Sequence, residues 1–281
     1  MAAFLSVLGF TLLLCGMSDC RRRRHSPDEH RHHHGHPEKA LQEVLFEDYN
    51  KLTRPVTKAS NAVVVWVGMS PLKLRNLDEK HQEIELDTWV NIKWKDPFLK
   101  WQPEDYDNLH SLVLPAEEVW KPDISVYTAT PDTSVRPTII TNVVVNSTGE
   151  IIWVPPFTIK SSCPMDSYDH KHEVICNIRI GSWTYNGHLL DLHMSKVDMS
   201  NYVDTHPDWR LVTVKTNEAA KLYECCDEEY LHINFNVTLV RKTSSHSHHS
   251  HSRNSDHSHN SDHHNSDHDW HGHSHTKRHH G

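Results

Sequence analysis

The sequence predicts an all-β protein in which antiparallel strands form a sandwich behind a single N-terminal α-helix. Three observations predict this fold class. Apolar and polar side chains alternate in the middle of the chain, as in strands with one buried face. Short strand-like runs, broken by Pro, Gly and Asp, follow one another at the spacing of a sandwich. Residues 38–242 remain once the polar ends are set aside, and they suffice for one well-buried domain.

The helix is predicted first, and the strands follow it. Pro37 is suited to the first turn of a helix, and the apolar face of that helix is expected to carry Leu41, Val44, Leu45 and Leu52.

Strands are predicted after Pro55. Even positions from Ile84 to Trp94 are mostly apolar and odd positions mostly polar, which indicates a half-buried strand. The same alternation runs from Tyr230 to Leu239. Further short strands are predicted at residues 62–69, 124–128, 139–145, 151–154, 174–184 and 211–216.

Histidine-rich ends explain the low overall hydrophobicity. Only 36% of the 281 residues are hydrophobic, and the mean hydropathy is −0.66. The deficit is local, since 14 of the 28 histidines lie in residues 246–280 and six more in residues 25–36. We therefore predict that residues 21–37 and 243–281 are disordered.

The N-terminus is typical of a secretory signal peptide. Residues 2–15 are uncharged and apolar, and small residues follow. We expect residues 1–20 to form the signal, with a buried helix as the weaker alternative. Arg21–Arg24 also match a processing site for a basic-specific protease. Two Asn-x-Ser/Thr sequons, at Asn146 and Asn236, fit an exported chain.

Charge and hydropathy exclude two classes of protein. The formal net charge is −8, and no basic face remains once the arginines at 21–24 are set aside, so nucleic-acid binding is not expected. No apolar run reaches the 18 or so residues of a membrane-spanning helix, so we expect no membrane span.

Four cysteines remain beyond the first twenty residues: Cys163, Cys176, Cys225 and Cys226. An even number in an exported chain favours two disulfides. Adjacent cysteines can bridge only through a strained eight-membered ring. A metal-binding pair or two free thiols therefore stay open for Cys225 and Cys226.

Four aromatic rings occupy the polar register of their strands: Trp89, Tyr127, Trp183 and Tyr230. Tyr223 lies two residues before the adjacent cysteines. A large ring facing solvent must be covered by a partner, a loop or a ligand. One such ring is most simply packed under a loop, but five together indicate a group of electron-rich faces. Such a group suits an organic cation.

The segments around these rings resemble the ligand-binding domain of the pentameric Cys-loop receptors, and more closely the soluble acetylcholine-binding proteins. The similarity covers about residues 38–242 and implies an immunoglobulin-like β-sandwich preceded by one α-helix. The segments that carry it are residues 89–94, 120–127, 149–155, 181–184 and 223–230, with the Cys163 and Cys176 pair between them.

The resemblance implies a binding site between subunits and two disulfides, Cys163–Cys176 and Cys225–Cys226. The principal side would comprise Tyr127, Trp183, Tyr223, Cys225, Cys226 and Tyr230. The neighbouring subunit would contribute Trp89, Val144, Ile152 and Val154. Asp123 and Ser182 resemble the pair that orients the Trp183 segment. One chain carrying both halves completes the site only in a closed head-to-tail oligomer, which in this family is a pentamer.

Two departures from the receptor pattern bear on function. Cys163 and Cys176 enclose 12 residues, one fewer than in the membrane receptors, and the apolar Phe-Pro-Phe-Asp signature is missing. A polar loop favours a soluble protein. Val144 and Asn146 stand where relatives often carry longer groups, and a glycan on Asn146 would lie near the site entrance, so the preferred ligand stays open.

We therefore expect a secreted, soluble homopentamer that binds acetylcholine, nicotine-like or other small cationic amines. It needs no cofactor and is not an enzyme, since no nucleophile–base set stands out. The alternative is a secreted metal-binding or scaffolding protein, because neutral imidazoles beside carboxylates can bind Zn²⁺ or Cu²⁺ weakly. The candidate ligands are His246, His248, His249, His251, His263 and His264. A receptor subunit truncated by alternative processing is a third possibility.

Overall fold

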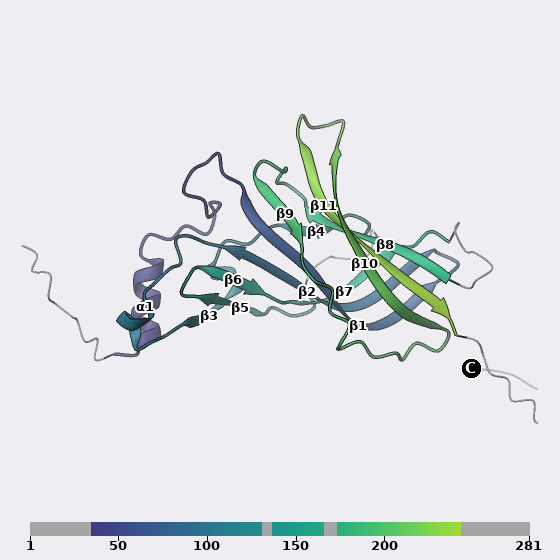
Figure 1. The fold of residues 1–281 in the computed structure, drawn as a ribbon, viewed down its shortest axis with the longest axis horizontal. Helices are drawn as coiled ribbons and strands as arrows, with labels where there is room; N and C mark the ends of the chain where they lie inside the picture. Colours follow the sequence, from purple (N-terminus) through teal and green to yellow (C-terminus); the bar gives the residue numbers. More distant parts are fainter. Residues whose placement is uncertain (1–34, 131–136, 166–172, 243–281) are drawn as a thin grey trace, which may run out of the picture. The chain divides into compact units, whose positions relative to one another are not determined.

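A computed structural model describes residues 35–130, 137–165 and 173–242 (Figure 1). The predicted signal peptide, most of the His-rich segment 21–37 and the tail 243–281 with its candidate metal ligands lie outside these residues. The elements are α1 (Pro37–Phe46), β1 (Val63–Asp78), β2 (Glu83–Lys95), η1 (Pro103–Tyr106), β3 (Ser111–Pro115), η2 (Ala116–Glu118), β4 (Ile124–Val126), β5 (Asn142–Asn146), β6 (Glu150–Trp153), β7 (Pro156–Ser162), β8 (Glu173–Ser182), β9 (Leu190–Met194), β10 (Trp209–Leu222) and β11 (Glu229–Arg241).

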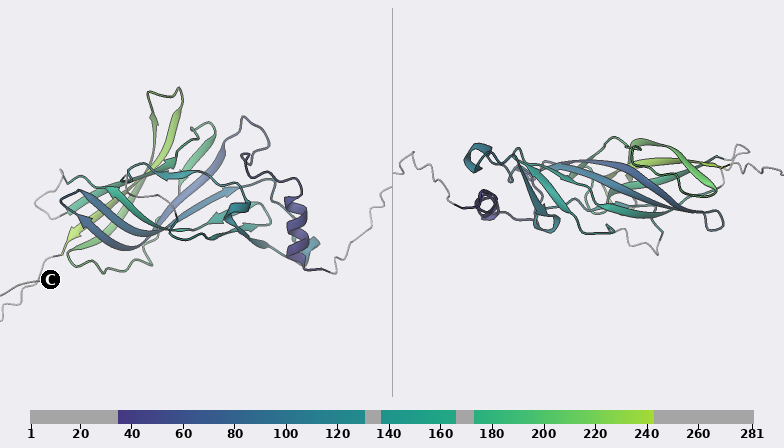
Figure 2. Two further views of the ribbon diagram at one scale, coloured as in Figure 1. Left: turned by 180° about the vertical axis from the view of Figure 1, so that it is seen from behind. Right: turned by 90° about the horizontal axis from the view of Figure 1, so that it is seen from below.

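Two sheets form the sandwich, as predicted (Figure 2). The larger sheet has seven strands in the order β3-β5-β6-β2-β1-β9, and β7 also pairs with β2. The smaller sheet has four strands in the order β10-β11-β8-β4. The described pairings are antiparallel except that of β1 with β9. The prediction of an all-β sandwich behind one helix is confirmed.

The apolar faces of both sheets form the core. In β2 the even positions from Ile84 to Trp94 are buried, as the alternation predicts. On the smaller sheet Ile178, Ile180 and Phe235 face the same core. Each fully buried side chain of this size contributes about 1.5–3 kcal/mol to stability. Because successive side chains of a strand point to opposite faces, the odd positions of β2 face outward.

The apolar face of α1 is narrower than predicted. The helix begins at Pro37, and Leu41 and Leu45 are buried. Val44, by contrast, is 56% exposed, and Leu52 lies beyond the helix and is 86% exposed. A helix of 10 residues that touches the domain along one side buries a single row spaced by four residues. The prediction was wrong for Val44 and Leu52.

Three strands were not predicted, two are longer than predicted by six residues or more, and β4 ends at Val126, two residues earlier than predicted. β3, β7 and β9 escaped the sequence pattern, while β1 extends to Asp78 and β10 to Leu222. Pro71 lies inside β1, where the pairing register shifts, and proline normally argues against a strand interior. At its start β5 is shorter than predicted, so that Ile139 and Ile140 lie outside the strand. In the described ranges no helix is both long and apolar enough to span a membrane.

Candidate ligand-binding site

β4, β8 and the β10–β11 hairpin bring four of the predicted rings together. Tyr127 follows β4 and Trp183 follows β8, and their ring centroids are 6.1 Å apart with the planes at 74°. Tyr223 and Tyr230 flank the hairpin tip, with centroids 5.9 Å apart and planes at 78°. Both pairs have the edge-to-face geometry that aromatic rings prefer.

Tyr127 connects the two pairs. Burial raises the pKa of the Tyr127 hydroxyl above its ordinary value, and the nearby Tyr223, Asp123 and Tyr230 raise it further. Tyr127 therefore lies within electrostatic reach of both hairpin tyrosines as well as in contact with Trp183. We call Tyr127, Trp183, Tyr223 and Tyr230 the aromatic group.

Gly181 makes room for the Tyr127 ring. A Cβ atom at Gly181 would lie 2.7 Å from the Tyr127 hydroxyl oxygen and 2.7 Å from the Leu231 carbonyl oxygen. The Tyr127 hydroxyl also donates a hydrogen bond to the Ser182 carbonyl, so the ring crosses β8 at this position. Sequence analysis did not single out Gly181 as a site residue. The signal was available, because a glycine inside a strand pattern indicates close approach of another group.

Asp123 holds the backbone that carries Trp183. Its carboxylate accepts hydrogen bonds from the Ser182 hydroxyl, from the Thr184 amide at 2.7 Å and from the Thr184 hydroxyl at 2.6 Å. The Ser182 hydroxyl oxygen in turn accepts the Tyr185 amide at 2.9 Å. Asp123 and Ser182 are thus paired beside Trp183, and Thr184 is a third member that sequence analysis missed.

The Trp183 side chain is largely open on the surface of the chain, with 67% of its surface exposed. It lies beyond the last residue of β8, although the predicted strand reached Thr184. The largest ring of the aromatic group is therefore open to a ligand or to a second subunit.

The β10–β11 hairpin carries the adjacent cysteines at its tip and projects beyond the rest of its sheet (Figure 1). Cys225 and Cys226 form a disulfide, and the Cys226 amide donates to the Tyr223 carbonyl at 3.1 Å. Cys225 and Cys226 are therefore neither two free thiols nor a metal-binding pair in this structure.

Two contacts join the hairpin to the loop after Trp183. The Gly187 amide donates to the Glu229 carbonyl at 2.8 Å, and His188 Nε2 lies 2.7 Å from a Glu228 carboxylate oxygen. The segments that carry the hairpin tyrosines and Trp183 are thus connected to each other directly.

The predicted complementary residues lie on the other sheet. Trp89 is on the outward side of β2 and is 38% exposed. Val144 of β5 pairs directly with Ile152 of β6, and both are exposed, as is Val154. The two predicted halves of the site therefore lie on different sheets of one chain.

Val113 extends this exposed apolar row. It pairs with Val144 from the neighbouring strand β3 and is itself exposed. Sequence analysis missed it because β3 was not predicted. The alternation of Leu112 and Leu114, both buried, around Val113 was the available signal.

The two sequons occupy different surroundings, and their glycosylation stays a prediction. The Asn146 side-chain oxygen accepts hydrogen bonds from the amides of Thr148 and Glu150 in the β5–β6 turn. Asn236 lies on the central strand β11, where its side-chain amide donates to Asn217 at 3.3 Å and its oxygen accepts from Asn177 at 2.7 Å.

Comparison with known families identifies the domain. The family described as the neurotransmitter-gated ion-channel ligand binding domain matches residues 38–243. The chain belongs to this family. It is a ligand-binding family, not an enzyme family, and the Cys163–Cys176 disulfide of this ligand-binding domain joins the end of β7 to β8.

Curated relatives of this ligand-binding domain are acetylcholine receptor subunits. The chain is 36% identical over 221 residues to "Acetylcholine receptor subunit alpha-like" of Manduca sexta, covering 74% of this chain and 43% of the relative. It is 35% identical over 216 residues to "Neuronal acetylcholine receptor subunit alpha-2" of Gallus gallus, covering 76% and 40%. It is 36% identical over 211 residues to "Neuronal acetylcholine receptor subunit alpha-6" of Mus musculus, covering 73% and 42%. The chain spans about two fifths of the length of these relatives.

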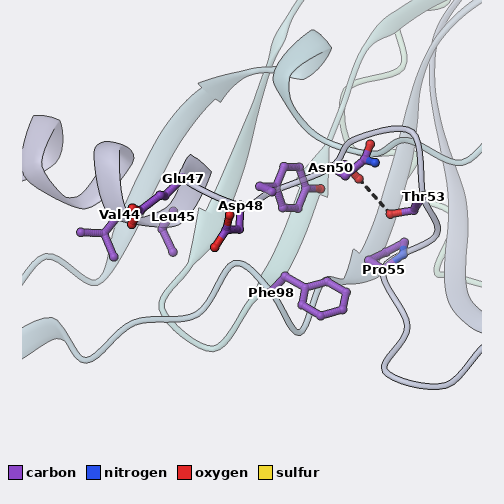
Figure 3. A pocket seen from close by; sticks show the side chains of 9 residues that line it. Val44, Leu45, Glu47, Asp48, Asn50, Thr53, Pro55 and Phe98 are labelled. Carbon is purple, nitrogen blue, oxygen red and sulfur yellow. Dashed lines mark hydrogen bonds between the residues drawn. The ribbon is translucent and has the colours of Figure 1, made fainter. Parts of the chain in front are cut away.

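The ligand-binding domain also has a cavity of about 330 Å³ beside the C-terminal end of α1 (Figure 3). Val44, Leu45, Asp48 and Phe98 are among its lining residues, and none of these belongs to the aromatic group. Its lining combines these apolar side chains with the rings of Tyr49 and Phe98 and the carboxylates of Glu47 and Asp48, and it is separate from the predicted ligand-binding residues. Nor does the described part of the domain hold a group of three or more His, Cys, Asp or Glu residues arranged for a metal.

Proposed function

We propose that the protein is a secreted homopentameric binding protein for acetylcholine or a related small cationic amine, and that it is not an enzyme. The observation that carries the proposal is the aromatic group. Four electron-rich rings meet at the edge of one protomer, with Trp183 open to the outside. Each contact between a cation and such a ring contributes roughly 0.5–2 kcal/mol to the binding free energy. Binding of this kind requires no cofactor.

The placement of the two halves supports assembly into a ring. The aromatic group lies at the smaller sheet, whereas Trp89 and the exposed apolar row lie on the larger sheet. A chain that carries the two halves on different faces can complete the site by joining head to tail with identical copies, and such contacts form a ring when the rotation between copies closes. The pentamer and acetylcholine-type ligand follow from the resemblance, and the relatives named acetylcholine receptor subunits support them.

Two features support secretion. Cys163–Cys176 and Cys225–Cys226 are disulfides, which persist in oxidising compartments. Residues 2–15 have the apolar character of a signal peptide. Expression of the full chain in animal cells tests this part of the proposal. We expect the protein in the culture medium, and its retention in the membrane fraction would contradict secretion.

Titration of the purified protein with acetylcholine and nicotine tests the binding function. We expect saturable quenching or enhancement of tryptophan fluorescence, together with the mass of a pentamer in sedimentation. Trp183→Ala should weaken binding by about 2 kcal/mol or more, roughly thirtyfold, because it removes a central anchor. Trp66→Ala is the matched control, since Trp66 is an exposed ring of β1 outside the aromatic group. Absence of a saturable response to any amine would refute the proposal.

A second proposal concerns the histidine-rich tail. Its 14 histidines lie among aspartates, and neutral imidazoles with carboxylates bind Zn²⁺ or Cu²⁺. We propose weak metal binding there, with scaffolding as its alternative use. Deleting residues 244–281 should abolish zinc uptake and leave amine binding intact. Metal binding that survives the deletion would contradict a metal site in the tail. An assembly that binds metal but never amines would favour the metal-binding function over the amine-binding function.

A further inference from the structure

His232 lies directly behind the Tyr127 ring. The two ring centroids are 6.2 Å apart, and His232 pairs across the sheet with Gly181, the residue that Tyr127 crosses. The alternation in β11 places His232 on the polar face, yet only 5% of its surface is exposed. The difference arises because Tyr127, which follows β4, covers this position. A titratable ring is thus buried next to the aromatic group.

The surroundings of His232 are positive. Within the described residues its Nδ1 atom is buried and has no hydrogen-bond partner. Arg179 of β8 and Lys221 of β10 both act on the ring with positive charge, and the Lys221 ammonium lies 4.8 Å from the Tyr223 ring centroid. A backbone hydrogen bond to Tyr230 acts in the opposite direction and favours the charged form of the ring. Asp123, which lies near Tyr127, is hydrogen-bonded to Ser182 and Thr184.

A proton on His232 would therefore oppose a cationic ligand. It would place a further positive charge behind Tyr127, beside the positive charges of Arg179 and Lys221 that already act on the imidazole. That charge would repel an ammonium held by the aromatic group and would compete for the electron density of the Tyr127 ring. The neutral ring imposes neither penalty.

We propose that His232 makes amine binding at this site pH dependent, with tight binding requiring its neutral form. The inference rests on the proposed function, because it concerns the same site. Burial, and after it Arg179, lower the pKa of His232 below its ordinary value near 6.5. The ring is therefore neutral at pH 7.5, and affinity falls as the pH decreases through this lowered pKa.

The experiment compares acetylcholine affinity at pH 7.5 and pH 5.5, at one ionic strength, in the full-length assembled protein. For the wild type we expect a severalfold loss at the lower pH, which approaches about tenfold only when His232 is fully protonated, the effect of one elementary charge at roughly 10 Å. His232→Phe keeps a flat ring without a titrating group, and His232→Gln keeps a neutral polar one. Both should lose most of this pH dependence and bind as the wild type does at pH 7.5.

His81→Gln is the matched control, because His81 pairs with Asp78 at the β1–β2 turn, outside the aromatic group. It should retain the pH dependence of the wild type. Melting curves at both pH values establish that each variant is folded.

Proton counting gives a second test, whose first measurement uses the wild type alone. Calorimetric titration at pH 6.0 in buffers of different ionisation enthalpy measures protons exchanged on binding. By linkage the wild type should release protons when acetylcholine binds, and His232→Phe should release fewer. Equal pH dependence in the wild type and in both His232 variants, or no proton release by the wild type, would overturn the inference while the proposed function stands. If no amine binds at pH 7.5, the proposed function fails and this inference fails with it.

Discussion

At the scale of single residues, a missing side chain is as important as the rings. Gly181 leaves the space in which Tyr127 crosses β8, and a Cβ atom there would approach the Tyr127 hydroxyl and the Leu231 carbonyl at 2.7 Å each. Both neighbours are fixed, Leu231 by its strand and Tyr127 by its hydrogen bond to the Ser182 carbonyl. An added methyl group must therefore displace the ring.

Gly181→Ala should disturb both stability and binding. We expect a loss of about 1–3 kcal/mol in the free energy of unfolding from overpacking, measured in urea, and at least a tenfold loss of amine affinity. Gly187→Ala is the control, because its Cβ would meet mainly the flexible Leu231 side chain, at 3.2 Å. Wild-type affinity in Gly181→Ala would contradict the role assigned to Tyr127.

Residue alternation predicted which rings face outward, but not what covers them. Trp89 and Trp183 are exposed, as their register indicates. His232 shares the register of Tyr230 but is buried, since the covering ring comes from a segment about one hundred residues earlier. Alternation within one strand contains no information about such a contact.

At the scale of elements, the two disulfides act on different parts of the domain. Cys163–Cys176 is buried in the core and spans 13 residues of sequence. Cys225–Cys226 joins neighbours at the tip of the projecting hairpin. A disulfide stabilises mainly by restricting the unfolded chain, and more so for a longer loop. We therefore expect Cys163–Cys176 to contribute mainly to stability and Cys225–Cys226 mainly to ligand binding.

Replacing both cysteines of each pair with serine tests this separation. The Cys163/Cys176 double variant should lose about 2–5 kcal/mol of stability. The Cys225/Cys226 variant should melt close to the wild type but bind acetylcholine several-fold more weakly, because Tyr223 and Tyr230 lose their stiff connection. Thermal melting and ligand titration measure the two effects. A hairpin variant with unchanged affinity would show that the bridge does not position the tyrosines.

Strands with strong alternation could be predicted from sequence, and those defined by their partners could not. β2 and β11 each bury one face along most of their length. The outer half of β10, from Lys215 to Leu222, is largely exposed, so its strand state depends on pairing with β11. Such a segment has no hydrophobic pattern of its own to predict it.

At the scale of the whole molecule, the sandwich separates the two halves of the site. The aromatic group belongs to the smaller sheet and its loops, whereas Trp89 and the row of Val113, Val144 and Ile152 belong to the larger sheet. Sequence motifs predicted all of these residues except Val113, which lies on a strand that was not predicted. In the proposed assembly the two halves meet only through a second copy of the chain, and no pattern within one strand specifies how two surfaces join.

The most direct test of this account is complementation between two inactive subunits. Trp183→Ala and Trp89→Ala each remove one half of every site, so neither variant alone should bind acetylcholine tightly. When the two are co-expressed in equal amounts, about a quarter of the interfaces join an intact Trp183 to an intact Trp89. We therefore predict that calorimetry of the mixed assembly recovers about a quarter of the wild-type sites at wild-type affinity. Mixed assemblies that form but recover no sites would contradict a binding site shared between subunits.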